Sequence, residues 1–156
     1  MRSTTGNGIT ASDRASRSDA RPVMLATLDT PFDPRASELA VDSALESGQR
    51  LIVVNVSSVA IMPASMTMGY AYLESEELRD ALRAPAELAV SFNVPVELLR
   101  VASPHPADAL LELVEERRPS LVVLGPDTTM VRGRLYRRAA RKLREHATCL
   151  VWLADD

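Results

Sequence analysis

The chain has 156 residues, of which 46% are hydrophobic and 25% are charged, and its formal net charge is -3 at pH 7. These values are typical of one soluble globular domain and exclude a fibrous or wholly disordered protein. The acidic excess also argues against a protein that coats nucleic acid with its whole surface, because such proteins are usually net positive.

No stretch reaches the roughly 18 apolar residues that span a bilayer, and the N-terminus lacks the apolar core of a secretory signal. We therefore expect a cytoplasmic protein without membrane association. Cys149 is the only cysteine, so an intrachain disulfide is excluded. Its place in the apolar stretch CLVWL favours a buried, unreactive thiol.

Residues 1–20 read MRSTTGNGITASDRASRSDA and contain scarcely an apolar side chain. Such a segment cannot offset the entropy lost on ordering. The sequence predicts a disordered N-terminal tail over residues 1–20, followed by a single domain over residues 21–156. A regulatory or targeting role is the functional alternative for the tail.

After the tail, short apolar stretches alternate with segments of helical periodicity. Residues 23–28, VMLATL, are apolar on both faces, which predicts a buried parallel strand. Asp33 followed by Pro34 is a helix start signal and Gly48 is a stop signal, so we expect a helix over residues 34–47. Residues 51–56, LIVVNV, predict the second strand.

A loop rich in small residues and methionine precedes a second helical stretch, residues 73–92. Pro85 lies inside this stretch and predicts a kink or a break, because proline removes one helical hydrogen bond and clashes with the preceding turn. The side chains at core spacing are Leu78, Leu82, Ala86 and either Ala89 or Val90.

The remaining elements follow the same alternation. Residues 94–101 predict a third strand, and a third helix begins at Pro106 and ends before Pro119. Residues 121–125 predict a fourth strand, a basic fourth helix follows, and residues 149–154 predict a fifth strand. The expected inward side chains are Ala107, Leu110, Leu111 and Val114 in the third helix and Leu135, Ala139 and Leu143 in the fourth.

Alternating strands and helices predict an α/β fold with one open five-stranded parallel sheet and helices on both faces. In such a sheet, ligands bind beyond the carboxyl ends of the strands, where the winding direction reverses. If the first and fourth strands are central neighbours, the candidate site residues are Asp29 and Thr30, residues 55–58 and residues 125–128. A lone aspartate at a strand end is also a common cap or turn residue, so both interpretations of Asp29 stay open.

Four segments of the chain, VMLATLDT, LIVVNV, LVVLG and REHATCLVWL, carry a likeness to a known family. From about Arg21 to Leu153 the chain resembles the universal stress proteins. The resemblance implies a Rossmann-like, adenine nucleotide alpha hydrolase-like sheet with strand order 3-2-1-4-5, and commonly a homodimer that pairs the last strands. Some members bind ATP and others do not. In the binders, the residues that hold the adenosine correspond to Asp29 and the backbone of Val56.

The nucleotide signature of this family is glycine, two residues, glycine, nine residues, glycine, then serine or threonine. Glycines let the backbone approach phosphate oxygens, and backbone amides with a helix N-terminus receive the negative charge. This chain supplies Gly125, but Thr128 replaces the second glycine. Arg138 and Ala139 replace the last pair, or Arg137 and Arg138 in a loop one residue shorter.

An arginine side chain would fill space that the phosphates need, and Pro126 removes one backbone donor. We therefore expect ATP binding by the usual mode to be lost or weakened. No cofactor is expected, although ATP remains a candidate ligand, and Asp29, Val56, Gly125, Thr128 and Arg138 are the candidate binding residues.

Seven basic residues after Gly125 admit two interpretations, and they are Arg132, Arg134, Arg137, Arg138, Arg141, Lys142 and Arg144. They form either a solvated helix face or an anion site that holds a nucleotide, a phosphorylated metabolite or nucleic acid by side-chain forks. Tyr136 is the only aromatic residue among them, which disfavours single-stranded nucleic acid.

Catalytic signatures are absent from the sequence. His105 and His146 do not form a metal pair, and no nucleophile elbow or zinc-peptidase motif is present. A related adenylate-transferring or phospho-acceptor enzyme is a third hypothesis, but the residues after the first strand and the position of Lys142 fit neither class. We therefore expect a non-enzymatic stress-response regulator that acts as a homodimer through its last strand, with an unidentified protein partner. The alternative is a sensor of ATP or another phosphate ligand that uses Asp29 and the basic helix.

Overall fold

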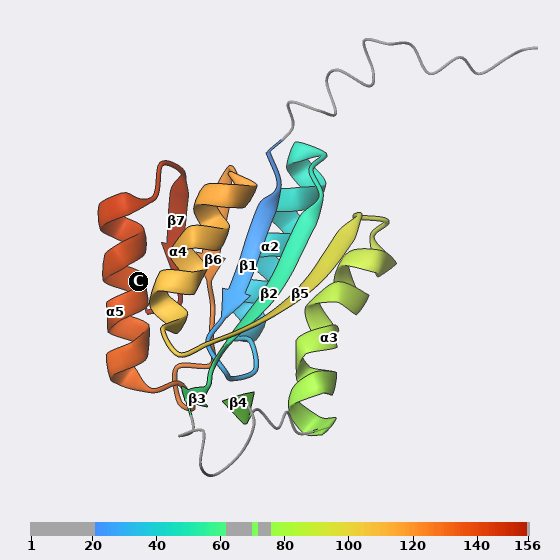
Figure 1. The fold of residues 1–156 in the computed structure, drawn as a ribbon. Coiled ribbons are helices and arrows are strands. Elements are labelled where there is room, and N and C mark those ends of the chain that lie inside the picture. The colour runs from blue at the N-terminus through green and yellow to red at the C-terminus, as the bar shows by residue number, and fades with distance from the viewer. Residues whose placement is uncertain (1–20, 62–69, 72–75, 156) are drawn as a thin grey trace, which may run out of the picture.

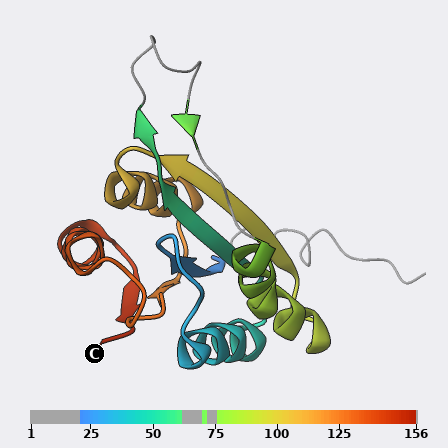
Figure 2. The ribbon, with the colours of Figure 1, turned by 90° about the horizontal axis from the view of Figure 1, so that it is seen from below.

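The computed structural model describes residues 21–61, 70–71 and 76–155. The predicted tail, residues 1–20, lies outside the described residues. A five-stranded sheet is sandwiched between two pairs of helices, with α4 and α5 on one face and α2 and α3 on the other (Figures 1 and 2). The strands are β1 (Val23–Thr27), β2 (Leu51–Ser58), β5 (Val96–Ser103), β6 (Leu121–Leu124) and β7 (Leu150–Leu153), and the helices are α2 (Pro34–Ser47), α3 (Glu76–Ser91), α4 (Pro106–Arg117) and α5 (Gly133–His146).

The strand order is β5-β2-β1-β6-β7, and every pair in this sheet is parallel. Numbered along the chain, this is the predicted order 3-2-1-4-5, so the fold prediction is confirmed. The central strand β1 pairs with both β2 and β6, which places the reversal of winding between β1 and β6. Two short strands that were not predicted, β3 (Ala60–Ile61) and β4 (Tyr70–Ala71), pair with each other in an antiparallel manner.

Each face of the sheet has its own apolar core. On one face, Met24, Ile52 and Val122 pack in one cluster with side chains of α4 and α5. On the other face, Leu25, Val53 and Val123 pack in a second cluster with side chains of α2 and α3. The central strands are therefore buried on both sides, which explains their continuous apolar sequence.

Helix α2 begins and ends at the predicted residues, because a capping residue lies at each end. The Asp33 carboxylate accepts hydrogen bonds from the backbone N–H groups of Arg35 (2.8 Å) and Ala36 (3.4 Å). At the other end Gly48 adopts the left-handed region, with φ 67°.

Replacing the cap tests its contribution. We expect Asp33→Ala to lower the free energy of unfolding by about 1 kcal/mol, because two helix N–H groups lose their acceptor. Urea denaturation at pH 7 measures this change. Asp33→Asn is the matched control, since its amide oxygen retains an acceptor, and an equal loss in both variants would contradict the capping role.

Some predictions about the helices need correction. The break considered at Pro85 does not occur, because α3 continues as one helix from Glu76 to Ser91. Of the two alternatives Ala89 and Val90, Ala89 faces the core, since Val90 is 61% exposed. In α4 Leu113 is buried while Leu111 is only partly buried, because the helix turns a slightly different face to the sheet.

The same small rotation applies to α5, where Tyr136 is buried and Leu135 is partly buried. The third strand begins at Val96, two residues later than predicted. Cys149 is partly buried, and burial raises the pKa of its thiol, which keeps the thiol protonated near neutral pH. Within the described ranges, the helices are too short or too polar to cross a membrane.

Candidate functional site

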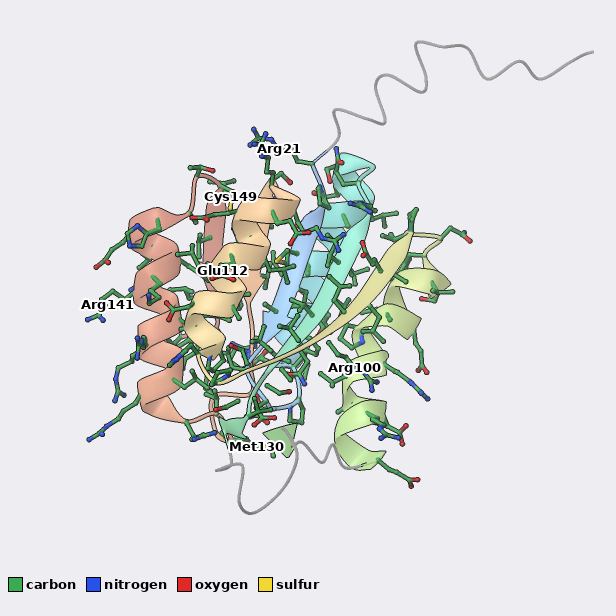
Figure 3. All side chains as sticks on the ribbon, in the orientation of Figure 1. Arg21, Arg100, Glu112, Met130, Arg141 and Cys149 are labelled. Carbon is green, nitrogen blue, oxygen red and sulfur yellow. The ribbon has the colours of Figure 1, made fainter. Side chains whose placement is uncertain are left out.

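Two loops meet at the carboxyl edge of the central strands, residues 28–33 after β1 and residues 125–132 after β6. The Asp127 N–H donates to the Pro31 carbonyl (2.9 Å), and the Asp33 N–H donates to the Gly125 carbonyl (2.9 Å). Met130 of the second loop lies at the opposite end of the sheet from Cys149 (Figure 3). The loops are therefore closed onto each other at the position where this fold class binds ligands.

Polar groups at the ends of β1 and β2 join neighbouring loops. The Asp29 N–H donates to Asn55 Oδ1 (3.0 Å), and Asn55 Nδ2 donates to Ser57 Oγ (3.1 Å). Asn55 and Ser57 are each only 2% exposed. Asp29 has a φ of 61°, a left-handed conformation that aspartate adopts more readily than most residues. Asp29 is partly buried, and its backbone N–H is held by Asn55 of the second strand.

Gly125 has a packing role that the sequence did not reveal. A Cβ atom at this position would lie 2.1 Å from the Cβ atom of Ala36 in α2. The Gly125 N–H also donates to the Ala26 carbonyl (3.0 Å), which continues the pairing of β6 with β1. Glycine is therefore required here by the close approach of α2, whether or not a phosphate binds.

Most backbone N–H groups of the loop after β6 donate hydrogen bonds to other groups of the protein. The Asp127 carboxylate accepts from the Thr129 hydroxyl (2.6 Å) and the Thr129 N–H (2.9 Å), and these bonds lower the pKa of Asp127. The amides of Met130 and Val131 donate to the Asp127 carbonyl (3.1 and 3.0 Å). The engaged amides of this loop are those of Gly125, Asp127, Thr129, Met130 and Val131. Since Pro126 has no N–H, Thr128 contributes the one other backbone donor between residues 125 and 131.

A cavity of about 240 Å³ lies beside this loop, between the first turns of α4 and α5. Its polar lining residues are Ser58, His105, Asp108, Arg132, Arg134 and Arg138. The Asp108 carboxylate forms an ion pair with Lys142 of α5, and the hydrogen bond to Lys142 lowers the pKa of Asp108. The cavity is therefore open and has three arginine side chains in a lining that also includes the apolar residues Pro104, Pro106, Ala107 and Leu135.

The structure places the predicted site residues on several different elements. Asp29 and Gly125 lie on the two adjoining loops, whereas Val56 is fully buried in β2, one residue beyond the last pair with β1. Thr128 is exposed in the loop, and Arg138 lies in the second turn of α5, where it lines the cavity. The cavity lining contains Arg138 but none of the other four predicted residues.

The start of α5 bears on the nucleotide signature. Gly133 is the first residue of α5, and Arg138 lies five residues further along the helix. His105 is a cavity residue that the sequence reasoning considered only as a metal ligand. Its position two residues after β5 could have identified it, because the strand-end rule applies to that strand as well. Within the described part of the chain, no group of three or more His, Cys, Asp and Glu side chains is placed to hold a metal ion.

Comparisons with known proteins agree with this architecture. A universal stress protein from Archaeoglobus fulgidus has 15% sequence identity and a TM-score of 0.61, with 89% of this chain and 97% of that chain covered. A universal stress protein in complex with cAMP has 21% identity and a TM-score of 0.57, with 86% and 95% covered. The Archaeoglobus fulgidus protein in complex with dAMP has 18% identity and a TM-score of 0.52, with 85% and 96% covered.

A comparison with curated proteins gives no match. The model of the universal stress protein family, in contrast, matches residues 20–154, which is nearly the whole chain outside the first residues. The chain belongs to the universal stress protein family.

Proposed function

We propose that this chain is a non-enzymatic, cytoplasmic stress-response regulator that acts as a homodimer on a protein partner and no longer binds ATP through the loop after β6. Residues 21–156 form its working domain in this proposal. The observation that carries the proposal is the engagement of five loop amides within the protein itself.

A phosphate-binding loop must direct backbone N–H groups at the ligand. In this chain those donors are used by the loop, by β1 and by the Pro31 carbonyl. The Asp127 carboxylate is negatively charged at neutral pH, as an aspartate with an ordinary pKa would be, and the hydrogen bonds from Thr129 lower its pKa further. It would therefore repel a triphosphate. Both effects oppose the usual mode of ATP binding.

Relatives of similar fold were solved with dAMP and cAMP, which makes adenine nucleotides the appropriate ligands to test. Asp29 and the backbone of Val56 are the proposed adenosine contacts if a nucleotide does bind. The second candidate function is therefore a nucleotide sensor that uses Asp29 for adenosine and Arg138 for phosphate. The observation in its favour is the placement of Arg138 on a cavity beside the loop.

One binding experiment separates the two candidates. We expect MgATP at about 1 mM to raise the melting temperature by no more than about 1 °C beyond the shift given by inorganic triphosphate at equal ionic strength. Differential scanning fluorimetry measures the shift, and calorimetry with adenosine supplies the matched control without phosphates. ATP binding that is clearly tighter than binding of triphosphate and of adenosine would defeat the proposal and favour the sensor.

The proposed dimer would form at the free edge of β7. The N–H groups of Leu150 and Ala154 donate to the Ser120 and Leu124 carbonyls, so these residues face β6. Because strand residues alternate, Val151 and Leu153 direct their backbone groups to the open edge. Leu150 is also 74% exposed. An apolar edge with unused backbone groups favours pairing with a second copy.

A further inference from the structure

We propose that a separate cavity, at the amino ends of β1, β6 and β7, binds a free α-amino acid with a small aliphatic side chain. The cavity has a volume of about 320 Å³ and lies beside the last turns of α4 and α5. Arg21 and Cys149, which line it, lie at the opposite end of the sheet from Met130 of the loop after β6 (Figure 3). The site goes beyond the proposed function, because it does not depend on that loop or on dimerisation. We refer to it as the amino-edge cavity, and its polar lining residues are Arg21, Glu115, Arg118, His146, Thr148 and Cys149.

Charges of both signs line the amino-edge cavity without being paired to each other. Arg21 and Arg118 are exposed cations, and Glu115 is an exposed carboxylate. Within the described ranges, none of these three side chains forms an ion pair. A simple anion would be attracted by the arginines but repelled by Glu115, and a simple cation would meet the reverse. A ligand that carries both charges satisfies the whole lining.

The ends of two helices favour the ammonium group of such a ligand. The last carbonyl groups of a helix lack partners within the helix and carry partial negative charge. At the end of α4 the Arg118 N–H donates to the Val114 carbonyl (3.0 Å), and at the end of α5 the Ala147 N–H donates to the Leu143 carbonyl (2.9 Å). Each cap thus engages one terminal carbonyl, and the others add partial negative charge to that of Glu115.

Arg118 occupies a backbone position that favours glycine. It caps α4 with a φ of 47°, whereas Gly48 caps α2 with a φ of 67°. A residue with a side chain is less stable than glycine in this left-handed region, so capping alone does not explain an arginine here. Arg117 already supplies a cation to the end of α4 and forms an ion pair with Glu97 (3.0 Å). A role in binding explains Arg118 better, because a guanidinium fork matches the two oxygens of a carboxylate.

The remaining lining accommodates an aliphatic side chain. Val114 and Pro119 are buried, and Ala147 is partly buried. Cys149 adds a partly buried thiol, which packs as a small apolar group. The volume of about 320 Å³ lies at the lower end of the roughly 300–1,000 Å³ of small-molecule sites. The size and the lining together fit an amino acid such as valine.

The first test compares ligands that differ by one charged group. We expect L-valine to bind the full-length chain with a Kd below about 1 mM in titration calorimetry at neutral pH and constant ionic strength. Isovalerate lacks the ammonium group of valine, and isobutylamine lacks its carboxylate. Each should bind at least about 10-fold more weakly, because charge-assisted hydrogen bonds are lost. Equal binding of valine and either analogue would overturn the proposal.

Two substitutions assign the charged groups of the cavity. Arg118→Gly should weaken valine binding by about 10-fold to 100-fold, because the carboxylate loses its fork. Glycine suits the left-handed backbone at this position, so we expect circular dichroism to show an intact fold. Glu115→Gln should weaken valine binding by a similar factor. The same variant should bind isovalerate as tightly as the wild type or more tightly, since a repelling carboxylate has been removed.

Glu112→Gln is the matched control. Glu112 is an exposed carboxylate three residues earlier on α4 (Figure 3) and does not line the cavity, so we expect its variant to keep the wild-type affinity. The proposal is overturned if valine gives no saturable heat, if Arg118→Gly keeps full affinity, or if Glu112→Gln weakens binding as much as Glu115→Gln does.

Discussion

Gly125→Ala should lower the free energy of unfolding by about 3 kcal/mol, at the upper end of the cost of adding a methyl group to a packed core. The new Cβ atom would lie 2.1 Å from the Cβ atom of Ala36, and both residues are fully buried. The carbon atoms cannot share this space, so α2 must move away from the end of β6. Urea denaturation followed by circular dichroism measures the loss.

Two companion variants make the result specific. Gly133→Ala is the matched control, because its Cβ atom would meet only the flexible end of Arg137, at 3.1 Å, and we expect a change within about 0.5 kcal/mol. Combining Gly125→Ala with Ala36→Gly removes the opposing methyl group and should restore part of the stability. Strictly additive losses in the double variant would contradict the steric explanation.

Val151→Pro should convert the proposed dimer into a folded monomer. The backbone of Val151 faces the open edge of β7, so proline removes a donor from the edge without removing one from the pairing with β6. In a two-fold dimer the loss occurs twice, and we expect the association to weaken by about 2 kcal/mol or more, roughly 30-fold. Analytical ultracentrifugation over a range of protein concentrations measures this change.

The neighbouring residue provides the control. Trp152 has the same facing as Leu150 and Ala154, so Trp152→Pro removes a hydrogen bond between β7 and β6 and should destabilise the monomer itself. A Val151→Pro protein that remains a dimer would reject the β7 edge as the interface. A wild-type protein that is monomeric at all concentrations would reject the dimer altogether.

The features that the sequence predicted correctly are those determined by residues that are close together in the chain. Helix α2 has its cap at Asp33, its proline at Pro34 and its left-handed glycine at Gly48, and its bounds were predicted to the residue. The alternation of elements predicted a parallel sheet, because connections in such sheets obey one handedness. The strand order was implied by the family resemblance, and the structure has that order.

The features that the sequence could not predict depend on distances between elements. Nothing in the residues around Gly125 indicates that Ala36, nearly ninety positions earlier, would lie against it. The choice of Leu113 over Leu111 depends on a helix rotation that hydrophobic periodicity does not resolve. Likewise, the grouping of His105 with Arg138 required α4 and α5 to begin side by side.

The contact between Gly125 and α2 also affects how the glycine pattern of the nucleotide loop should be interpreted. The packing of α2 against the sheet requires this glycine by itself. A protein of this family can therefore lose nucleotide binding and still keep the first glycine of the nucleotide signature. Sequence searches that use this first glycine as evidence of nucleotide binding will therefore include proteins in which the glycine serves only to pack a helix against the sheet.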